Sequence, residues 1–171
     1  MLYLIKFAFS AILAPIMTTT THTAIGSVIG LYILNPILGF VVGLLLHFLV
    51  DMIPHGDGDM RSEEERKLDK KNTKVFLYGT LDVLVAFFLL IVLVNVRDPQ
   101  FILPFTMAIA GSVLPDLLVG IHDATKSKLL DKFVALHWFF HDFFLKRFGD
   151  VKLSFSLLGQ AVFIIIWLNV F

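Results

Sequence analysis

The chain has 171 residues, of which 57% are hydrophobic and 18 are phenylalanine, and its mean hydropathy is +0.85. Ordinary soluble domains contain about 45–50% apolar residues, so this composition predicts one integral membrane domain over residues 1–171. The formal net charge is zero, which gives no reason to expect a nucleic-acid partner. Because the chain has no cysteine, disulfides, thiolate zinc sites, iron–sulfur clusters and cysteine nucleophiles are excluded.

Successive apolar segments predict an all-α bundle of about five or six membrane spans with an additional amphipathic helix. Residues 1–17 superficially resemble a secretory signal, but we expect this segment to stay as a first membrane helix. The span 101–121 is interrupted by Pro104, Gly111, Pro115 and Asp116, and the helix could break at Pro115 because proline removes a helical hydrogen bond. Three later segments are also apolar enough to cross a bilayer, namely residues 75–96, 101–121 and 153–171.

A membrane hairpin is predicted between the first segment and these later spans. One helix is expected over about residues 20–34, and it carries Gly26 and Gly30 as a small-residue face on which another helix can pack. The chain turns at Asn35–Pro36, and a second helix returns as far as about Ile53. The start of the first helix therefore lies at the same membrane surface as the end of the second.

Basic residues predict the orientation of the chain in the membrane. The polar loop 54–74 and the region 122–152 each carry six Lys and Arg residues, whereas the turn 97–100 carries only Arg97. Such residues are enriched in cytoplasmic loops, so both basic regions are expected on the cytoplasmic side of the inner membrane. The segment 134–148, VALHWFFHDFFLKRF, has the mixture of aromatic and basic residues of a helix that lies in the membrane interface.

Ionisable residues inside apolar helices need partners, because lipid provides none. His47 and Asp51 are four residues apart and share one helix face. At 1.5 Å per residue, Asp82, Asp116 and His47 each lie roughly 9–12 Å from the cytoplasmic ends of their segments. Structural explanations exist as well, since Asp82 could bond a neighbouring helix and Asp116 could cap a helix break.

Histidines from other segments are expected in the same layer. His22 belongs to the start of the hairpin, and His55 follows its end together with Asp57. His137 and His141 lie one helical turn apart on the interfacial helix, whereas Asp142 and Asp150 have the pattern of solvated or capping acids. We therefore predict one polar site at the cytoplasmic side. Its predicted metal ligands are His22, His47, Asp51, His55, Asp116, His137 and His141, and its predicted proton acceptor is Asp57 or Asp82.

Imidazole and carboxylate ligands suit a divalent metal such as zinc, with manganese or iron as alternatives. Seven candidate ligands are too many for one four-coordinate zinc ion. The site therefore holds either two ions, or one ion together with a base and supporting carboxylates.

Three short motifs, HFLVDMIPHGD, GSVLPD and HWFFH, resemble the membrane-bound metal-dependent hydrolases, also described as LexA-binding, inner-membrane-associated hydrolases. The resemblance implies that His47 and Asp51 match the first family motif and Asp116 the second. His137 and His141 match the third loosely, because their spacing is four rather than five. Leu118 stands where the family's second motif has another acid, and the order of the motifs differs.

Three functions are compatible with these residues. The first is hydrolysis of an ester or phosphoester of a lipid-like substrate through metal-bound water. The second is transport of a divalent metal or of protons, which also uses intramembrane Asp and His residues. The third is a structural membrane protein in which a metal joins helices. The sequence predicts the lipid bilayer as a partner in all three cases.

Overall fold

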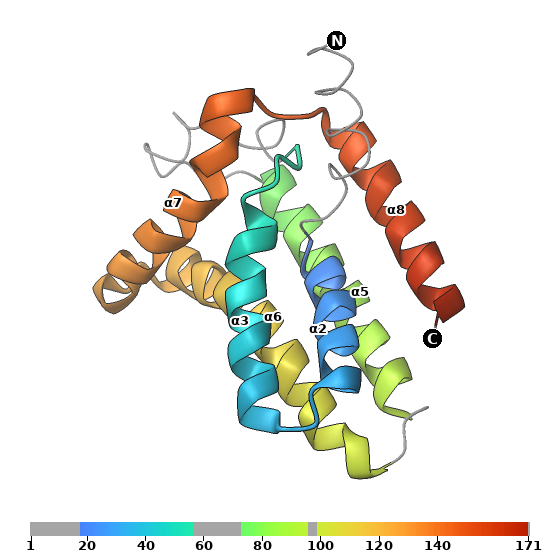
Figure 1. Cartoon of the computed structure of the whole chain (residues 1–171). Coiled ribbons are helices and arrows are strands. Elements are labelled where there is room, and N and C mark those ends of the chain that lie inside the picture. Colours follow the sequence, from blue (N-terminus) through green and yellow to red (C-terminus); the bar gives the residue numbers. More distant parts are fainter. Residues whose placement is uncertain (1–17, 57–72, 96–98, 171) are drawn as a thin grey trace.

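The computed structural model describes residues 18–56, 73–95 and 99–170 (Figure 1). It is all-helical, with 88% helix and no strand in this part of the chain, which confirms the predicted all-α class. The predicted first helix, residues 1–17, and most of the charged loop 54–74 lie outside the described residues. The helices are α2 (Thr19–Tyr32), α3 (Pro36–Asp51), α5 (Thr73–Asn95), α6 (Pro99–Thr125), the 3-10 helix η2 (Lys128–Leu130), α7 (Asp131–Phe148) and α8 (Leu153–Val170).

The predicted hairpin is present as α2 and α3. The side chain of Thr18 accepts a hydrogen bond from the backbone N–H of Thr21 and so caps the first turn of α2. The side chain of Asn35 accepts from the N–H groups of Ile37 and Leu38 at the start of α3, where Pro36 lacks an N–H that would need a partner. Helix α3 ends at Asp51, slightly earlier than expected.

Helix α6 packs against both arms of this hairpin. Gly26 and Gly30 of α2 allow the close approach, because a Cβ atom at these positions would lie 2.6 Å from Ile109 Cα and 2.5 Å from Phe105 Cα, respectively. The small-residue face predicted for this helix is therefore used for packing against α6. Phe105 and Ile109 belong to the buried core, which Trp167 of α8 joins by donating a hydrogen bond to Ser27 of α2.

The helix does not break at Pro115, the alternative considered for Asp116, because α6 continues without interruption and contains both Pro104 and Pro115. A proline inside a helix removes one backbone donor, but packing against neighbouring membrane helices makes the change tolerable. Pro115 is fully buried and so has such neighbours. As a consequence, Asp116 lies within a helix and is not a cap at a helix end.

Two helices are long and apolar enough to cross a membrane, Leu77–Asn95 and Phe101–Thr125. A third span is possible if α7 and α8, bent by 116° at the break between them, are counted as one. The described residues thus provide fewer spans than the five or six predicted. One reason is that the predicted first span, residues 1–17, lies outside the described residues. The other is length, since α2 and α3, at 14 and 16 residues, extend only about 21 and 24 Å, whereas a bilayer core is about 30 Å thick.

Candidate metal centre

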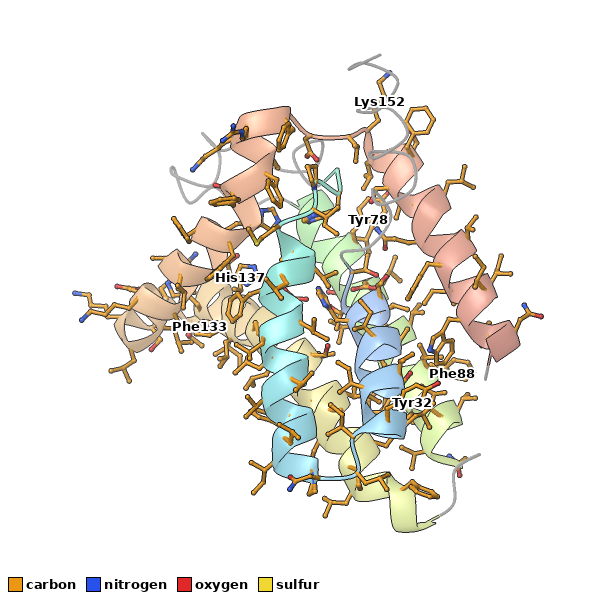
Figure 2. All side chains as sticks on the ribbon, viewed as in Figure 1. Tyr32, Tyr78, Phe88, Phe133, His137 and Lys152 are labelled. Atoms are coloured by element: carbon orange, nitrogen blue, oxygen red, sulfur yellow. The ribbon has the colours of Figure 1, made fainter. Side chains whose placement is uncertain are left out.

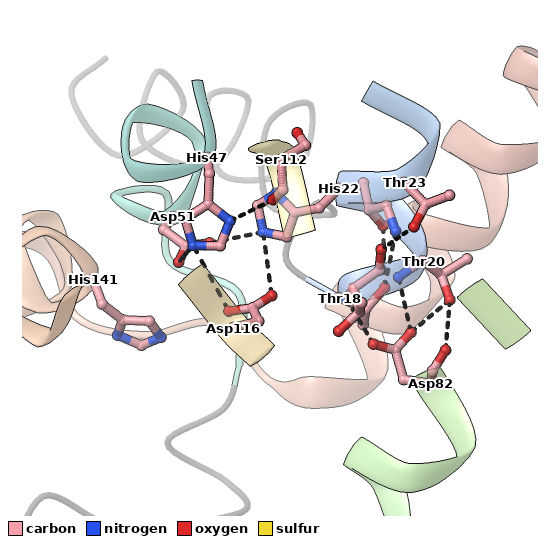
Figure 3. A network of polar contacts seen from close by, with 12 residues as sticks. Thr18, Thr20, His22, Thr23, His47, Asp51, Asp82, Ser112, Asp116 and His141 are labelled. Atoms are coloured by element: carbon pink, nitrogen blue, oxygen red, sulfur yellow. Dashed lines mark hydrogen bonds and ion pairs between the residues drawn. The ribbon is translucent and has the colours of Figure 1, made fainter. Parts of the chain in front are cut away.

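Helix α2 begins beside the end of α3 (Figure 1), and polar side chains of α2, α3 and α6 meet there (Figure 3). His137 of α7 joins them. His22 comes from the first turn of α2, and His47 and Asp51 come from the last turns of α3. Asp116 is placed beside them by the packing of α6 on both helices, and His137 by the contacts of α7 with α3 and α6. The hairpin and α6 therefore bring together residues that are distant in the sequence.

His47, Asp51, Asp116 and His137 could hold a metal ion. Their ligand atoms all lie within 4.8 Å of one another. His47 Nε2 is 3.0 Å from Asp51 Oδ2 and 3.7 Å from Asp116 Oδ1, and His137 Nε2 is 3.6 Å from the same oxygen of Asp51. Ligand atoms around a tetrahedral zinc ion are about 3.3 Å apart, so modest movements would complete such a geometry.

The hydrogen bonds of His47 suit a metal ligand. Its Nδ1 donates to the backbone carbonyl of Ser112 at 2.8 Å, which leaves Nε2 with its lone pair in the neutral ring. His47 is fully buried, and its Nε2 has no hydrogen-bond partner although Asp51 Oδ2 is close. A lone pair buried against a carboxylate oxygen is unfavourable, and a cation between the two atoms would remove the conflict.

His22 supports Asp51 from the other side. Its Nε2 donates to Asp51 Oδ1 at 3.0 Å, and its ring lies against that of His47 with centroids 4.2 Å apart. Its distance from Asp116 Oδ2 is longer, at 3.9 Å. A residue that bonds the second oxygen of a ligating carboxylate orients that ligand, and the structure places His22 in this position.

Burial separates one member of the group from the others. The side chains of His47, Asp51 and His137 are 0–5% exposed, whereas that of Asp116 is 28% exposed. Phe48 packs edge-on against both His47 and His137. The group is therefore open only at Asp116 among its four members.

His55 and His141 form a neighbouring pair instead of joining this group. Their Nε2 atoms are 3.1 Å apart, and both residues are buried. His141 lies one turn after His137 on α7, with ring centroids 6.0 Å apart. The predicted ligands thus fall into a His/Asp group and a separate His pair.

Asp82, one of the two predicted proton acceptors, is not part of this group. Asp82 accepts hydrogen bonds from the backbone N–H groups of Thr19 and Thr20 at 2.6 and 3.2 Å, and from the Thr20 hydroxyl at 2.6 Å. It therefore caps the amino end of α2 from α5, the structural alternative considered for it, and it lies away from Asp116 (Figure 3). Asp57 lies outside the described residues.

Three supporting groups were not recognised from the sequence. The Ser112 carbonyl could not be found, because every residue has one and only packing selects it. Asp142, expected to be solvated or a cap, is 6% exposed and lies beside His141. Asp150 accepts a hydrogen bond from the N–H of Gly56 and holds the segment that carries His55. The position of Asp142 directly after His141 was the only local signal.

The chain matches no protein-family model, and neither a curated protein nor a solved structure shows significant similarity to it. The fold and the group together describe an all-helical protein with helices able to cross a membrane and with a His/Asp group able to bind a metal ion.

Proposed function

We propose that this protein is a metal-dependent hydrolase that cleaves an ester or phosphoester bond of a lipid-like substrate at a membrane surface. The observation that carries the proposal is the asymmetric burial of the metal group, with three buried members and an exposed Asp116. Structural metal sites are closed by protein ligands, whereas catalytic sites leave a position open for water and substrate.

We assign the binding of the ion to His47, Asp51 and His137, and a different role to Asp116. A divalent cation held here, zinc in this proposal, would activate a water molecule and stabilise charge on a phosphoryl or carbonyl oxygen. Asp116 lies at the open side, 3.7 Å from His47 Nε2, where its carboxylate can accept a proton from that water. Manganese or iron would suit the same ligands.

The apolar surface supports a substrate that is dissolved in the bilayer. Large apolar side chains of α5 are exposed, including Leu84, Phe87 and Phe88 at 59–68% exposure, as expected for a helix that contacts lipid. In this proposal a lipid-like ester reaches the exposed side chain of Asp116 from the membrane. Membership of the membrane-bound metal-dependent hydrolases, which the three sequence motifs resemble, is part of this proposal.

The proposal includes a location at the cytoplasmic face of an inner membrane. The basic regions 54–74 and 122–152 adjoin the ends of α3 and α6 that are nearest to the group. With the excess of Lys and Arg on the cytoplasmic side, the centre faces the cytoplasm. A full set of five or six spans would require segments other than Leu77–Asn95 and Phe101–Thr125 to cross the membrane as well.

The distribution of polar groups favours hydrolysis over transport. A carrier needs a polar path that reaches both membrane surfaces. Residues 28–46, which lead from α2 through the turn into α3, contain no histidine and no acid. His22, His47, Asp51 and Asp116 lie together at one end of the hairpin, which suits a surface enzyme. The exposed side at Asp116 in turn favours an enzyme over a protein in which the metal only joins helices.

The test uses the purified full chain, loaded with zinc and incubated with vesicles of phosphatidylethanolamine and phosphatidylglycerol. We expect release of fatty acid or phosphate, and no zinc uptake into vesicles that contain the protein. His47→Ala and Asp51→Ala should lose both the bound zinc and the activity. Asp116→Asn should keep the zinc, and its rate of hydrolysis should fall about 10²–10⁴-fold.

His122→Ala is the matched control, because His122 contacts Asp131 outside the metal group. It should retain both zinc and activity. The site assignment fails if Asp51→Ala binds as much zinc as the native protein. Zinc uptake without lipid hydrolysis would establish the transporter instead.

A further inference from the structure

A second pair of histidines, His55 and His141, lies beside the metal group and takes no part in the role assignments above. His55 comes from the segment after α3, and His141 from α7, one turn beyond His137. The two residues are 7% and 5% exposed, their rings meet at a centroid distance of 4.6 Å, and their Nε2 atoms are 3.1 Å apart. Two buried imidazole nitrogens thus face each other.

The neighbours of the two rings restrict where the protons can be. His55 Nδ1 lies 2.9 Å from the carbonyl oxygen of Ile53, which can only accept, so His55 carries its proton there and its Nε2 bears a lone pair. His141 Nδ1 lies 3.3 Å from Asp142 Oδ1. Lys146 is 3.3 Å from the other oxygen of Asp142, which is the arrangement of an ionised carboxylate.

Neither neutral form of His141 satisfies all of these contacts. With its proton on Nδ1 the ring donates to Asp142, but two lone pairs then face each other across 3.1 Å. With its proton on Nε2 the ring donates to His55, but a lone pair then faces the Asp142 carboxylate. An additional positive charge between or upon the two rings would relieve the conflict among these contacts in either form.

We propose that this charge is a second divalent cation, bound by His55 Nε2 and His141 Nε2 and completed by water. The separation of 3.1 Å is close to the roughly 3.3 Å between two ligands of a tetrahedral zinc ion. Each ring is also held through its Nδ1 by an oxygen acceptor, the arrangement typical of histidines that bind a metal. The carbonyl of Ile53 serves His55, and the carboxylate of Asp142 serves His141.

His137 connects this pair to the first centre. Its Nε2 approaches Asp51, while its ring lies 5.5 Å from that of His47 and 6.0 Å from that of His141. A role of the second cation in hydrolysis rests on the proposed function, in which the cation would add a positive charge beside the substrate. Its binding can be tested without any assay of activity.

The experiment measures zinc bound per chain at equilibrium. The metal-free full-length protein in detergent is dialysed against zinc alone, and bound zinc is determined by elemental analysis. We expect two equivalents for the native chain and one for His55→Asn, His141→Asn or His47→Ala. His122→Asn, the matched control, should keep two, because its contacts are with Asp123 and Asp131.

The remaining equivalent also reports on folding. If His141→Asn still binds one zinc ion, and that ion disappears when His47→Ala is added, the variant is folded and only the second centre is lost. Cobalt in place of zinc provides an independent signal, since cobalt in each centre has its own visible absorption. His141→Asn should remove one of these two absorptions.

Other outcomes separate the two proposals. If the native chain binds one zinc ion and only His47→Ala removes it, the second cation is overturned. His55 and His141 would then share a proton, and the proposed function would stand. Two ions in His141→Asn would also overturn it. If the native chain binds one ion and only His141→Asn removes it, the first centre is refuted instead.

Discussion

Asp51 contacts three histidines through its two oxygens, His22 at Oδ1 and both His47 and His137 at Oδ2. At 3% exposure it could not stay ionised in a protein interior without such partners. The three contacts are not equivalent, because His22 makes a hydrogen bond while His47 meets Asp51 with a nitrogen that makes none. A ligand and a supporting residue can thus be distinguished at the level of single atoms.

His22→Ala should weaken zinc binding about 10–100-fold without abolishing it, because residues that orient a metal ligand contribute affinity of this order. The dissociation constant can be measured by competition with a chelating dye. His47→Ala should eliminate binding at this centre, and His122→Ala should leave the constant unchanged. A loss in His22→Ala as complete as that in His47→Ala would make His22 a direct ligand.

Asp82→Ala should lower the free energy of unfolding by about 1–3 kcal/mol, because it leaves donors at the amino end of α2 without their acceptor. Asp82→Asn, which keeps one acceptor oxygen, should lose less. Denaturant unfolding in detergent measures the change, and zinc content should remain that of the native protein. Asp123→Ala, whose side chain is 43% exposed, should stay within about 0.5 kcal/mol. Loss of zinc at unchanged stability would place Asp82 in the metal site.

At the level of the helices, the distance between α3 and α6 determines whether the centre can form. Both sides of the site depend on this contact, since α3 carries His47 and Asp51 while α6 carries Asp116 and the Ser112 carbonyl. Gly43 of α3 lies directly against the backbone of Ala108 and Ser112. The glycine therefore allows the approach on which the group depends.

Gly43→Ala should destabilise the protein by about 1–3 kcal/mol and weaken zinc binding, because the new Cβ would meet the Ala108 carbonyl oxygen and lie 3.0 Å from Ser112 N. Thermal unfolding and zinc titration measure the two effects. Gly120→Ala on α6 is the matched control, since nothing lies within 4 Å of its added Cβ. It should be neutral or stabilising by about 0.5–1 kcal/mol. Equal behaviour of the two variants would contradict the close contact.

Phe88→Lys should impair membrane insertion of α5 by about 3 kcal/mol, because Phe88 is 68% exposed in the middle of the apolar stretch Leu77–Asn95. The inserted fraction of the segment can be measured in a translocation assay. Asn95→Lys is the control, since a lysine at the helix end can reach the membrane surface with its charge. Unchanged insertion of Phe88→Lys would show that Phe88 does not face lipid at the middle of the bilayer.

For the whole molecule, the metal group lies at one end of the hairpin, where His137 of α7 reaches it, and apolar side chains of α3 and α5 are exposed along the helices (Figure 2). The proposed orientation puts the end of α5 outside the cell and the segment between α6 and α7 in the cytoplasm. The absence of cysteine from the chain makes this arrangement directly testable, because any introduced thiol is the only one present.

Asn95→Cys should react with a membrane-impermeant thiol reagent in intact cells, and Lys128→Cys should react only after the cells are permeabilised. Both positions are exposed in the structure, so access to the reagent depends on the side of the membrane. Mass tagging of the labelled protein reports the outcome. The reverse pattern would place the metal centre on the outer side, and labelling of both in intact cells would show that α6 does not cross the membrane.

The sequence predicts the helical class, the hairpin and the pairing of His47 with Asp51, because each of these features depends on residues that are close together in the chain. A turn at Asn35–Pro36 and a spacing of four residues are local properties. The level of each polar residue along its helix is also local, since it increases by a constant 1.5 Å per residue. On this basis His22 is correctly expected beside the end of α3.

Packing alone decides which way each helix turns its polar residue. Asp82 and Asp116 have similar predicted depths, yet one caps α2 and the other faces His47, because rotation about the helix axis depends on contacts between helices. The same contacts keep α6 continuous through Pro115 and divide the histidines between the metal group and the pair His55–His141. Local spacing therefore specifies candidate ligands, and tertiary contacts specify which of them share a site.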